Sequence, residues 1–89
     1  MSVYVVQAGN AQLECDMEYA EGRDVICRLY GVEMSCLEDA VRKTGFQNYI
    51  KIEGDRFYIS TAIFKAGRTP GELIREIATL LRLCRSENS

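Results

Sequence analysis

The sequence predicts a single α+β domain over residues 1–89: a two-layer sandwich in which two helices cover one face of a five-stranded antiparallel sheet, in the order βββαββα. The length suffices for one hydrophobic core. Residues 12–19 alternate strictly between polar and apolar side chains, as a half-buried strand does. Residues 73–84 repeat apolar side chains every three or four positions, as an amphipathic helix does.

Three strands are expected in the first third of the chain, at residues 3–7, 12–19 and 25–33. Gly9-Asn10 offers a tight turn between the first two strands. Residues 21–23 offer a three-residue loop between the second and the third. The three strands are therefore expected to form a meander.

The loop at residues 21–23 sets the expected register of the second and third strands. It pairs apolar side chains on one face and an acid with a base on the other: Tyr19 with Val25, Met17 with Cys27, Cys15 with Leu29, and Asp16 with Arg28. A two-residue loop would place Arg28 against Cys15 on the buried face, and an unpaired buried charge costs about 3 to 5 kcal/mol. The longer loop is therefore expected.

A short helix is expected to begin at Ser35, because Ser35 and Glu38 have the spacing of a capping box. Its less polar stripe consists of Leu37, Ala40, Val41 and Thr44. Gly45 follows where a left-handed residue ends a helix. A helix of this length must pack on the sheet to be stable.

A hairpin is expected next, with Gly54-Asp55 as its two-residue turn. The turn pairs Ile52 with Phe57 and Ile50 with Ile59 on the core face, and Tyr49 with Ser60, Lys51 with Tyr58 and Glu53 with Arg56 on the other. The hairpin therefore has one apolar side and one amphipathic side.

The last helix is expected to begin at Thr69, with Pro70 in its first turn and Glu72 completing a capping box. Its apolar stripe consists of Leu73, Ile74, Ile77, Leu80, Leu81 and Cys84. Leu83 lies away from this stripe and is expected to be exposed.

Charge and hydropathy argue against several classes of partner. Eleven basic and thirteen acidic residues give a net charge of −2, which supplies no general attraction for nucleic acid or anionic lipid. The apolar run near the N-terminus is too short for a signal peptide, and no stretch approaches the length of a membrane span. No nucleic acid and no membrane are expected as partners, and a cytoplasmic location is expected.

The sequence shows no metal or cofactor motif. It contains no histidine, and Cys15, Cys27, Cys36 and Cys84 have no C-x-x-C spacing. The glycines stand at turns and caps and form no phosphate-binding series. Four buried reduced thiols, with no metal and no cofactor, are therefore expected.

A catalytic role is not expected, because histidine is the usual general base and is absent. Glu14, Asp16 and Glu18 line up on one strand face and are the only candidates for paired carboxylates. A solvated strand face with Arg28 opposite explains this row more simply.

The predicted interaction surface is the face of the sheet away from the helices. Its candidate partner-binding residues are Tyr49, Lys51, Arg56, Tyr58, Tyr30, Arg28, Glu14, Asp16 and Glu18, with Ile26, Met34 and Phe64 among them. Aromatic residues, Met and Arg are enriched at protein interfaces, where they bury large areas and keep a polar group. Tyr49 and Tyr58 are expected to anchor the partner, and the cations to orient it.

The second half of the chain, with "FYISTAIFKAGRTPGELIREIATLL", resembles the small α+β domain of bacterial type III secretion chaperones and related regulators. In that family a strand pair precedes a helix that starts Thr-Pro-x-Glu-Leu, matched here by Thr69, Pro70, Glu72 and Leu73. The likeness covers about half of the chain. Where that family opens with a helix, this chain opens with a strand. The resemblance implies an escort function and a dimer.

The predicted function is a non-enzymatic protein-binding module that inhibits, caps or escorts a larger protein. Immunity proteins, secretion chaperones and phage-encoded anti-defence inhibitors are of this kind. The alternative is a protein that binds or sequesters a small ligand, a nucleotide or metabolite, at a homodimer interface. The third hypothesis is a minimal enzyme that uses the acidic row. Leu83 and an uncovered sheet edge predict a homodimer.

Overall fold

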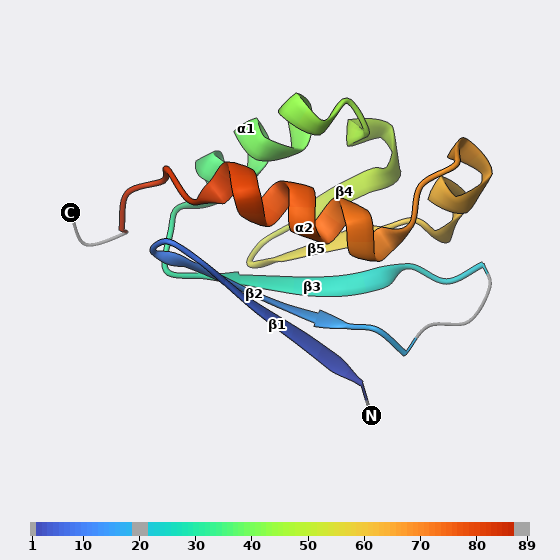
Figure 1. Ribbon diagram of the computed structural model, residues 1–89, viewed down its shortest axis with the longest axis horizontal. Helices are drawn as coiled ribbons and strands as arrows, with labels where there is room; N and C mark the ends of the chain where they lie inside the picture. Colours follow the sequence, from blue (N-terminus) through green and yellow to red (C-terminus); the bar gives the residue numbers. More distant parts are fainter. Residues whose placement is uncertain (1, 19–21, 87–89) are drawn as a thin grey trace.

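The computed structural model describes residues 2–18 and 22–86, and Figure 1 shows one sheet with two helices on one of its faces. The elements are β1 (Val3–Ala8), β2 (Ala11–Asp16), β3 (Val25–Tyr30), α1 (Met34–Thr44), η1 (Gln47–Tyr49), β4 (Ile50–Glu53), β5 (Arg56–Ile59), η2 (Thr61–Ala66) and α2 (Pro70–Leu81), where η denotes a 3-10 helix. The predicted α+β class and the order βββαββα are confirmed.

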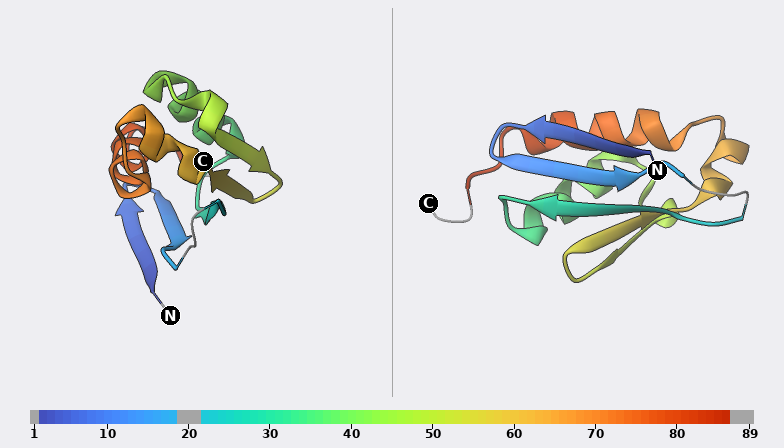
Figure 2. Two further views of the ribbon diagram at one scale, coloured as in Figure 1. Left: turned by 90° about the vertical axis from the view of Figure 1, so that its right-hand side faces the viewer. Right: turned by 90° about the horizontal axis from the view of Figure 1, so that it is seen from below.

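The five strands form one antiparallel sheet in the order β1-β2-β3-β5-β4. After β3 the chain passes through α1 to the outer edge of the sheet, runs along β4, and returns as β5 beside β3. Figure 2 shows this hairpin of β4 and β5 on the side of the sheet opposite β1. β1 and β4 are therefore the two edge strands.

The hydrophobic core fills the space between the sheet and the helices. Alternate residues of the strands, together with apolar residues of both helices and η2, are buried, and the fully buried large side chains include Leu13, Val25, Phe57, Ile59, Leu37, Ile63, Leu73, Ile74, Ile77 and Leu81. α2 lies against β1 and β2, and α1 packs beside α2. Because successive side chains of a strand point to opposite faces, one face of the sheet is buried in the core.

The register of β2 and β3 differs from the expected one by two residues. Glu14 lies opposite Arg28 and Cys15 opposite Cys27, whereas Cys15 was expected opposite Leu29 and Asp16 opposite Arg28. Met17, expected opposite Cys27, lies beyond the end of β2. The expected pair of Tyr19 with Val25 falls outside the described residues. Because the side-chain period of a strand is two, a shift of two residues keeps every side chain on its face.

A disulfide joins Cys15 and Cys27, and both residues are fully buried. The prediction of four reduced thiols is therefore wrong for this pair, since only Cys36 and Cys84 are free cysteines. The error follows from the register, because only the observed pairing places the two sulfurs opposite each other. Disulfides persist mainly in oxidising compartments, so this bond weighs against the predicted cytoplasmic location.

The hairpin of β4 and β5 has the predicted register. Ile50 pairs with Ile59, Lys51 with Tyr58, Ile52 with Phe57 and Glu53 with Arg56. The amide of Ser60 donates to the carbonyl of Tyr49 over 2.8 Å, so the expected pair of Tyr49 and Ser60 is also present. Gly54 has a φ of 60°, as a tight hairpin turn requires.

The first helix begins one residue earlier than expected. Its N-cap is Glu33, whose side chain makes no capping hydrogen bond, and Ser35 lies inside the first turn. The predicted capping box of Ser35 and Glu38 is therefore wrong. The C-terminal prediction is confirmed, because Gly45 is left-handed with a φ of 77° and donates its amide to the carbonyl of Arg42.

The second helix has the predicted start. The Thr69 hydroxyl accepts from the Glu72 amide at 3.1 Å, and Pro70 occupies the first turn. Arg68, just before the cap, forms ion pairs with Glu76 at 2.6 Å and Glu72 at 3.2 Å. The helix ends at Leu81, so Cys84, expected on its apolar stripe, lies beyond it.

The turn between β3 and α1 requires glycine. Gly31 has a φ of 89°, and a Cβ atom there would lie 2.1 Å from the carbonyl oxygen of Asn10. The end of β3 therefore meets the backbone of the turn between β1 and β2 at a distance that excludes any side chain.

Candidate functional site

The face of the sheet away from the helices, called the open face below, is the candidate interaction surface. It consists of the strand residues that alternate with the core residues: Val3, Val5, Gln7, Gln12, Glu14, Asp16, Ile26, Arg28, Tyr30, Lys51, Glu53, Arg56 and Tyr58. The right-hand view of Figure 2 shows the sheet from below, the side opposite the helices. No described element covers this face.

Two rows of paired residues cross the open face from β1 to β4. The mixed row runs through Val3, Asp16, Ile26, Tyr58 and Lys51. The charged row runs through Val5, Glu14, Arg28, Arg56 and Glu53. The observed register of β2 and β3 decides which residues share a row.

Large apolar side chains are exposed on the open face. Val3 and Val5 are 53% and 54% exposed, and Ile26 and Tyr30 are each 42% exposed. Ile26 lies between Asp16 and Tyr58 in the mixed row, and Tyr30 lies opposite Gln12 at the end of β3. Apolar side chains thus stand among charges, as at a non-obligate protein interface.

The charged row places two arginines side by side. Arg28 lies opposite Arg56, with Glu14 on one side of the pair and Glu53 on the other. Directly opposed like charges destabilise a strand pair unless acids or a ligand compensate them. A hollow of about 380 Å³ opens here, lined by Val3, Glu14, Cys15, Asp16, Ile26, Arg28 and Arg56. The hollow therefore has an apolar side, two guanidinium groups and two carboxylates.

Two short polar contacts join neighbouring side chains on the open face. The ammonium group of Lys51 lies 2.8 Å from a carboxylate oxygen of Glu53, and this hydrogen bond, assisted by the charge of Glu53, raises the pKa of Lys51. The side-chain amide of Gln12 donates a hydrogen bond to a carboxylate oxygen of Glu14 over 3.1 Å. Glu14 is thus held by Gln12 beside the arginine pair.

The structure brings together most of the predicted site residues, but not all of them. Glu14, Asp16, Arg28, Tyr30, Lys51, Arg56 and Tyr58 share the open face. Tyr49 lies in η1, is half-buried, and packs against the core and the ring of Phe46, with 6.0 Å between ring centroids. Its predicted place on the open face is therefore wrong, because a 3-10 turn replaces the regular strand there.

The remaining predicted residues also lie away from the strand rows. Glu18 follows the end of β2, where its amide donates to the carboxylate of Asp16, so the expected row with Glu14 and Asp16 ends at Asp16. Met34 is the first residue of α1 and packs on the core. Phe64 is 48% exposed in η2.

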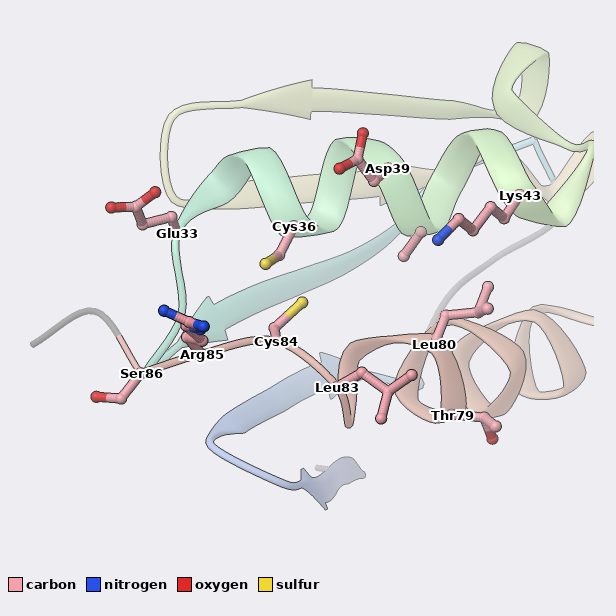
Figure 3. A pocket seen from close by; sticks show the side chains of 11 residues that line it. Glu33, Cys36, Asp39, Lys43, Thr79, Leu80, Leu83, Cys84, Arg85 and Ser86 are labelled. Carbon is pink, nitrogen blue, oxygen red and sulfur yellow. The ribbon is translucent and has the colours of Figure 1, made fainter. Parts of the chain in front are cut away.

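A second concave site lies between α1 and the segment after α2 (Figure 3). This groove has a volume of about 660 Å³ and is lined by Glu33, Cys36, Asp39, Ala40, Lys43, Thr79, Leu80, Leu83, Cys84, Arg85 and Ser86. Leu83 at its rim is 94% exposed, as predicted. No sequence pattern predicts the groove, because its two walls are far apart in the chain.

The two thiols of the groove are neighbours. Cys36 and Cys84 both line it, and both residues are half-buried. Burial, followed by the hydrogen bond and charge of Cys36, raises the pKa of Cys84 to about 11, and Asp39 adds to this while Lys43 opposes it. Cys84 is therefore protonated at neutral pH.

Neither site has the residues of a metal centre among the described part of the chain. Within residues 2–18 and 22–86, no three His, Cys, Asp or Glu side chains converge as metal ligands. The helices of the same residues are too short or too polar to span a bilayer. A comparison with family models, curated proteins and solved structures finds no match to this chain. The resemblance to type III secretion chaperones stays a prediction.

Proposed function

We propose that this chain is a non-enzymatic protein-binding module, and that the open face receives a larger partner protein which it inhibits, caps or escorts. The observation that supports this most is the group of exposed apolar side chains on that face: Val3, Val5, Ile26 and Tyr30. Such side chains lose little entropy and bury large areas when a partner covers them. The face also carries charges of both signs, which can fix the orientation of a partner.

The arginine pair indicates the chemistry of the partner. Arg28 and Arg56 face one hollow together with the apolar side chains of Val3 and Ile26, and the carboxylates of Glu14 and Asp16 line the same hollow. A carboxylate can accept two parallel hydrogen bonds from a guanidinium group, and these bonds strengthen when water is excluded. The partner is therefore expected to present an acidic side chain flanked by apolar groups.

The test compares two exposed aromatic residues, one on the open face and one off it. Tyr30 is 42% exposed on β3, and Phe64 is 48% exposed in η2. The tagged full chain, Tyr30→Ala and Phe64→Ala are each used to capture proteins from a native extract. A protein that the wild type and Phe64→Ala retain but Tyr30→Ala loses is the candidate partner.

The affinity of that partner is then measured by calorimetry with each purified variant. Tyr30→Ala is expected to weaken binding at least about tenfold, while Phe64→Ala leaves it unchanged. Arg28→Ala is expected to weaken binding and to reduce its dependence on salt. Equal affinities for Tyr30→Ala and the wild type would show that the partner binds elsewhere.

A small anionic ligand is the second candidate, and the hollow with Arg28 and Arg56 is the observation that favours it. Melting the protein with a panel of nucleotides and metabolites distinguishes the two functions. A ligand at about 100 times its dissociation constant adds about 2.7 kcal/mol of stability, and Arg28→Ala should abolish the shift. No shift with any member of the panel counts against this candidate.

A further inference from the structure

Cys36 and Cys84 come from distant parts of the chain and meet in one groove. Cys36 lies in the first turn of α1, and Cys84 lies three residues beyond the end of α2. Figure 3 shows both sulfur atoms directed into the space between α1 and the segment after α2. Both cysteines line this groove, one on each wall.

The backbone around Cys84 is fixed by its neighbours. Its amide donates to the carbonyl of Leu81 over 3.0 Å, and its carbonyl accepts from the side-chain amide of Asn10 at 3.2 Å. A Cβ atom on Gly9 would lie 2.6 Å from the carbonyl oxygen of Arg82, so the turn between β1 and β2 fits closely against this segment. These contacts hold the Cys84 side chain where it faces Cys36.

The two thiols are also the remaining half of an even cysteine set. Cys15 and Cys27 are already joined, so Cys36 and Cys84 are the only free cysteines of the chain. Four cysteines in a chain of 89 residues are compatible with two intramolecular bridges. The structure favours this connectivity, because Cys15 is bonded to Cys27, and Cys36 and Cys84 line the same groove.

We propose that Cys36 and Cys84 are a site of oxidative modification that closes to a second disulfide by exchange with a low-molecular-weight disulfide such as oxidised glutathione. The site is independent of the open face, and so of the proposed function.

The exchange takes place in two steps. The thiolate of Cys36 attacks one sulfur of the oxidant, the sulfur–sulfur bond of the oxidant breaks, and one thiol leaves with a proton. Cys84 then gives up its proton to water and attacks the Cys36 sulfur, and the second thiol leaves. Two electrons pass from the cysteine pair to the oxidant, and two molecules of the small thiol are released.

The environment of Cys84 is consistent with its role as the thiol that reacts in the second step. Burial and the neighbouring Cys36 keep its pKa at about 11, so it stays protonated while Cys36 is free. Asp39 disfavours its thiolate and Lys43 favours it, and Glu33 and Arg85 are the other charged residues of the groove. Once Cys36 is in the mixed disulfide, its charge no longer opposes ionisation of Cys84.

The test uses the full chain and oxidised glutathione. After oxidation, free thiols are blocked with iodoacetamide, and the denatured protein is cut with trypsin. Cleavage after Arg23, Arg28, Arg42 and Arg82 places the four cysteines on four different peptides. The expected product is a monomer without alkylated cysteine, in which the peptide of Cys36 is linked to that of Cys84.

Cys36→Ser and Cys84→Ser test the same pair one thiol at a time. Each variant is expected to keep glutathione on its remaining groove cysteine, because the second step has no attacking thiol. Wild-type protein that keeps glutathione or iodoacetamide on Cys36 and Cys84, or that links these residues between two chains, overturns the proposal. This result needs no variant, so a folding defect in either serine variant leaves the test intact.

Discussion

Cys15 on β2 and Cys27 on β3 lie directly opposite each other, with 4.0 Å between their Cα atoms. The backbone amide of Met17 donates to the carbonyl of Ser2 at the end of the β1–β2 pair. The backbone N–H and C=O groups of the odd-numbered residues of β2 therefore point toward β1. Cys15 therefore occupies a position that makes no backbone hydrogen bond to β3, where opposite strands approach most closely. The disulfide joins β2 to β3 inside the core.

Removing this disulfide is expected to lower the free energy of unfolding by about 3 kcal/mol, the usual effect of freeing a short loop in the unfolded chain. Two proteins are compared, and both carry Cys36→Ser and Cys84→Ser so that the groove contributes no bridge. The parent keeps the disulfide of Cys15 and Cys27, whereas the alanine variant also carries Cys15→Ala and Cys27→Ala. Urea unfolding gives the two free energies. A reductant should destabilise the parent and leave the alanine variant unchanged, and equal stabilities would contradict the role of the bond.

Gly31→Ala is expected to be among the most destabilising substitutions in the chain. Its Cβ atom would meet the Asn10 carbonyl at 2.1 Å, and backbone atoms cannot move aside as a side chain can. Gly54→Ala is the matched control, because Gly54 also has a positive φ but has open space around it. We expect a cost of about 1 kcal/mol for Gly54→Ala and at least about 2 kcal/mol more for Gly31→Ala. Thermal unfolding of both variants measures the difference.

The two tyrosines of the second hairpin are expected to behave differently. Tyr58 lies on the open face between Ile26 and Lys51, so Tyr58→Ala should cost about 2 kcal/mol of partner affinity and little stability. Tyr49 packs on the core, so Tyr49→Ala should lower the melting temperature and leave affinity unchanged. Calorimetry and thermal unfolding of both variants separate the roles. The reverse pattern would place the interface over η1.

The predicted homodimer is expected to form through β1. The backbone groups of Val3, Val5 and Gln7 point away from β2, and β1 carries no charged residue, whereas the other edge strand carries Lys51 and Glu53. Two copies of β1 can pair antiparallel about Val5. Val5→Lys should reduce the mass in light scattering from dimer to monomer, and Glu53→Lys should not. A wild-type monomer at high concentration excludes a stable dimer.

Alkylation of Cys84 is expected to depend on pH in a way that reports its environment. Its pKa is raised from an ordinary value of 9.0 to about 11, so its thiolate is about 50-fold rarer in the folded chain at pH 9. The rate with iodoacetamide should keep rising above pH 9 in the folded protein and level off near pH 9 in urea. Cys36→Ala removes the neighbouring thiol, which is the second cause of the raised pKa, and should move the inflection of the rate profile to lower pH. Identical folded and unfolded profiles would contradict the burial of Cys84.

The sequence predicts the faces of the strands better than their pairing. Alternation fixed which side of β2 and β3 is buried, because one residue of slip would expose the core. A slip of two residues keeps that pattern, so Cys15 could not be matched to Cys27 by alternation alone. The short turn at Gly54-Asp55 left no such freedom, and the register of β4 and β5 was predicted correctly.

Local motifs were reliable where the chain offered one solution. Thr69, followed by Pro70, could only cap a helix, whereas Ser35 competed with Glu33 for the start of α1. The displacement of Tyr49 into η1 and the groove of Cys36 and Cys84 depend on contacts between distant segments. No periodicity within one segment carries information about such contacts.

The position of β5 between β3 and β4 also bears on the order of folding. β1, β2 and β3 are neighbours in both sequence and space, and the β4–β5 hairpin is likewise local, so each can form without the other. The pairing of β3 with β5 must wait until the intervening α1 and β4 have closed a long loop. We therefore expect substitutions at the β3–β5 seam, such as Phe57→Leu, to slow folding, while substitutions at the β1 edge mainly speed unfolding.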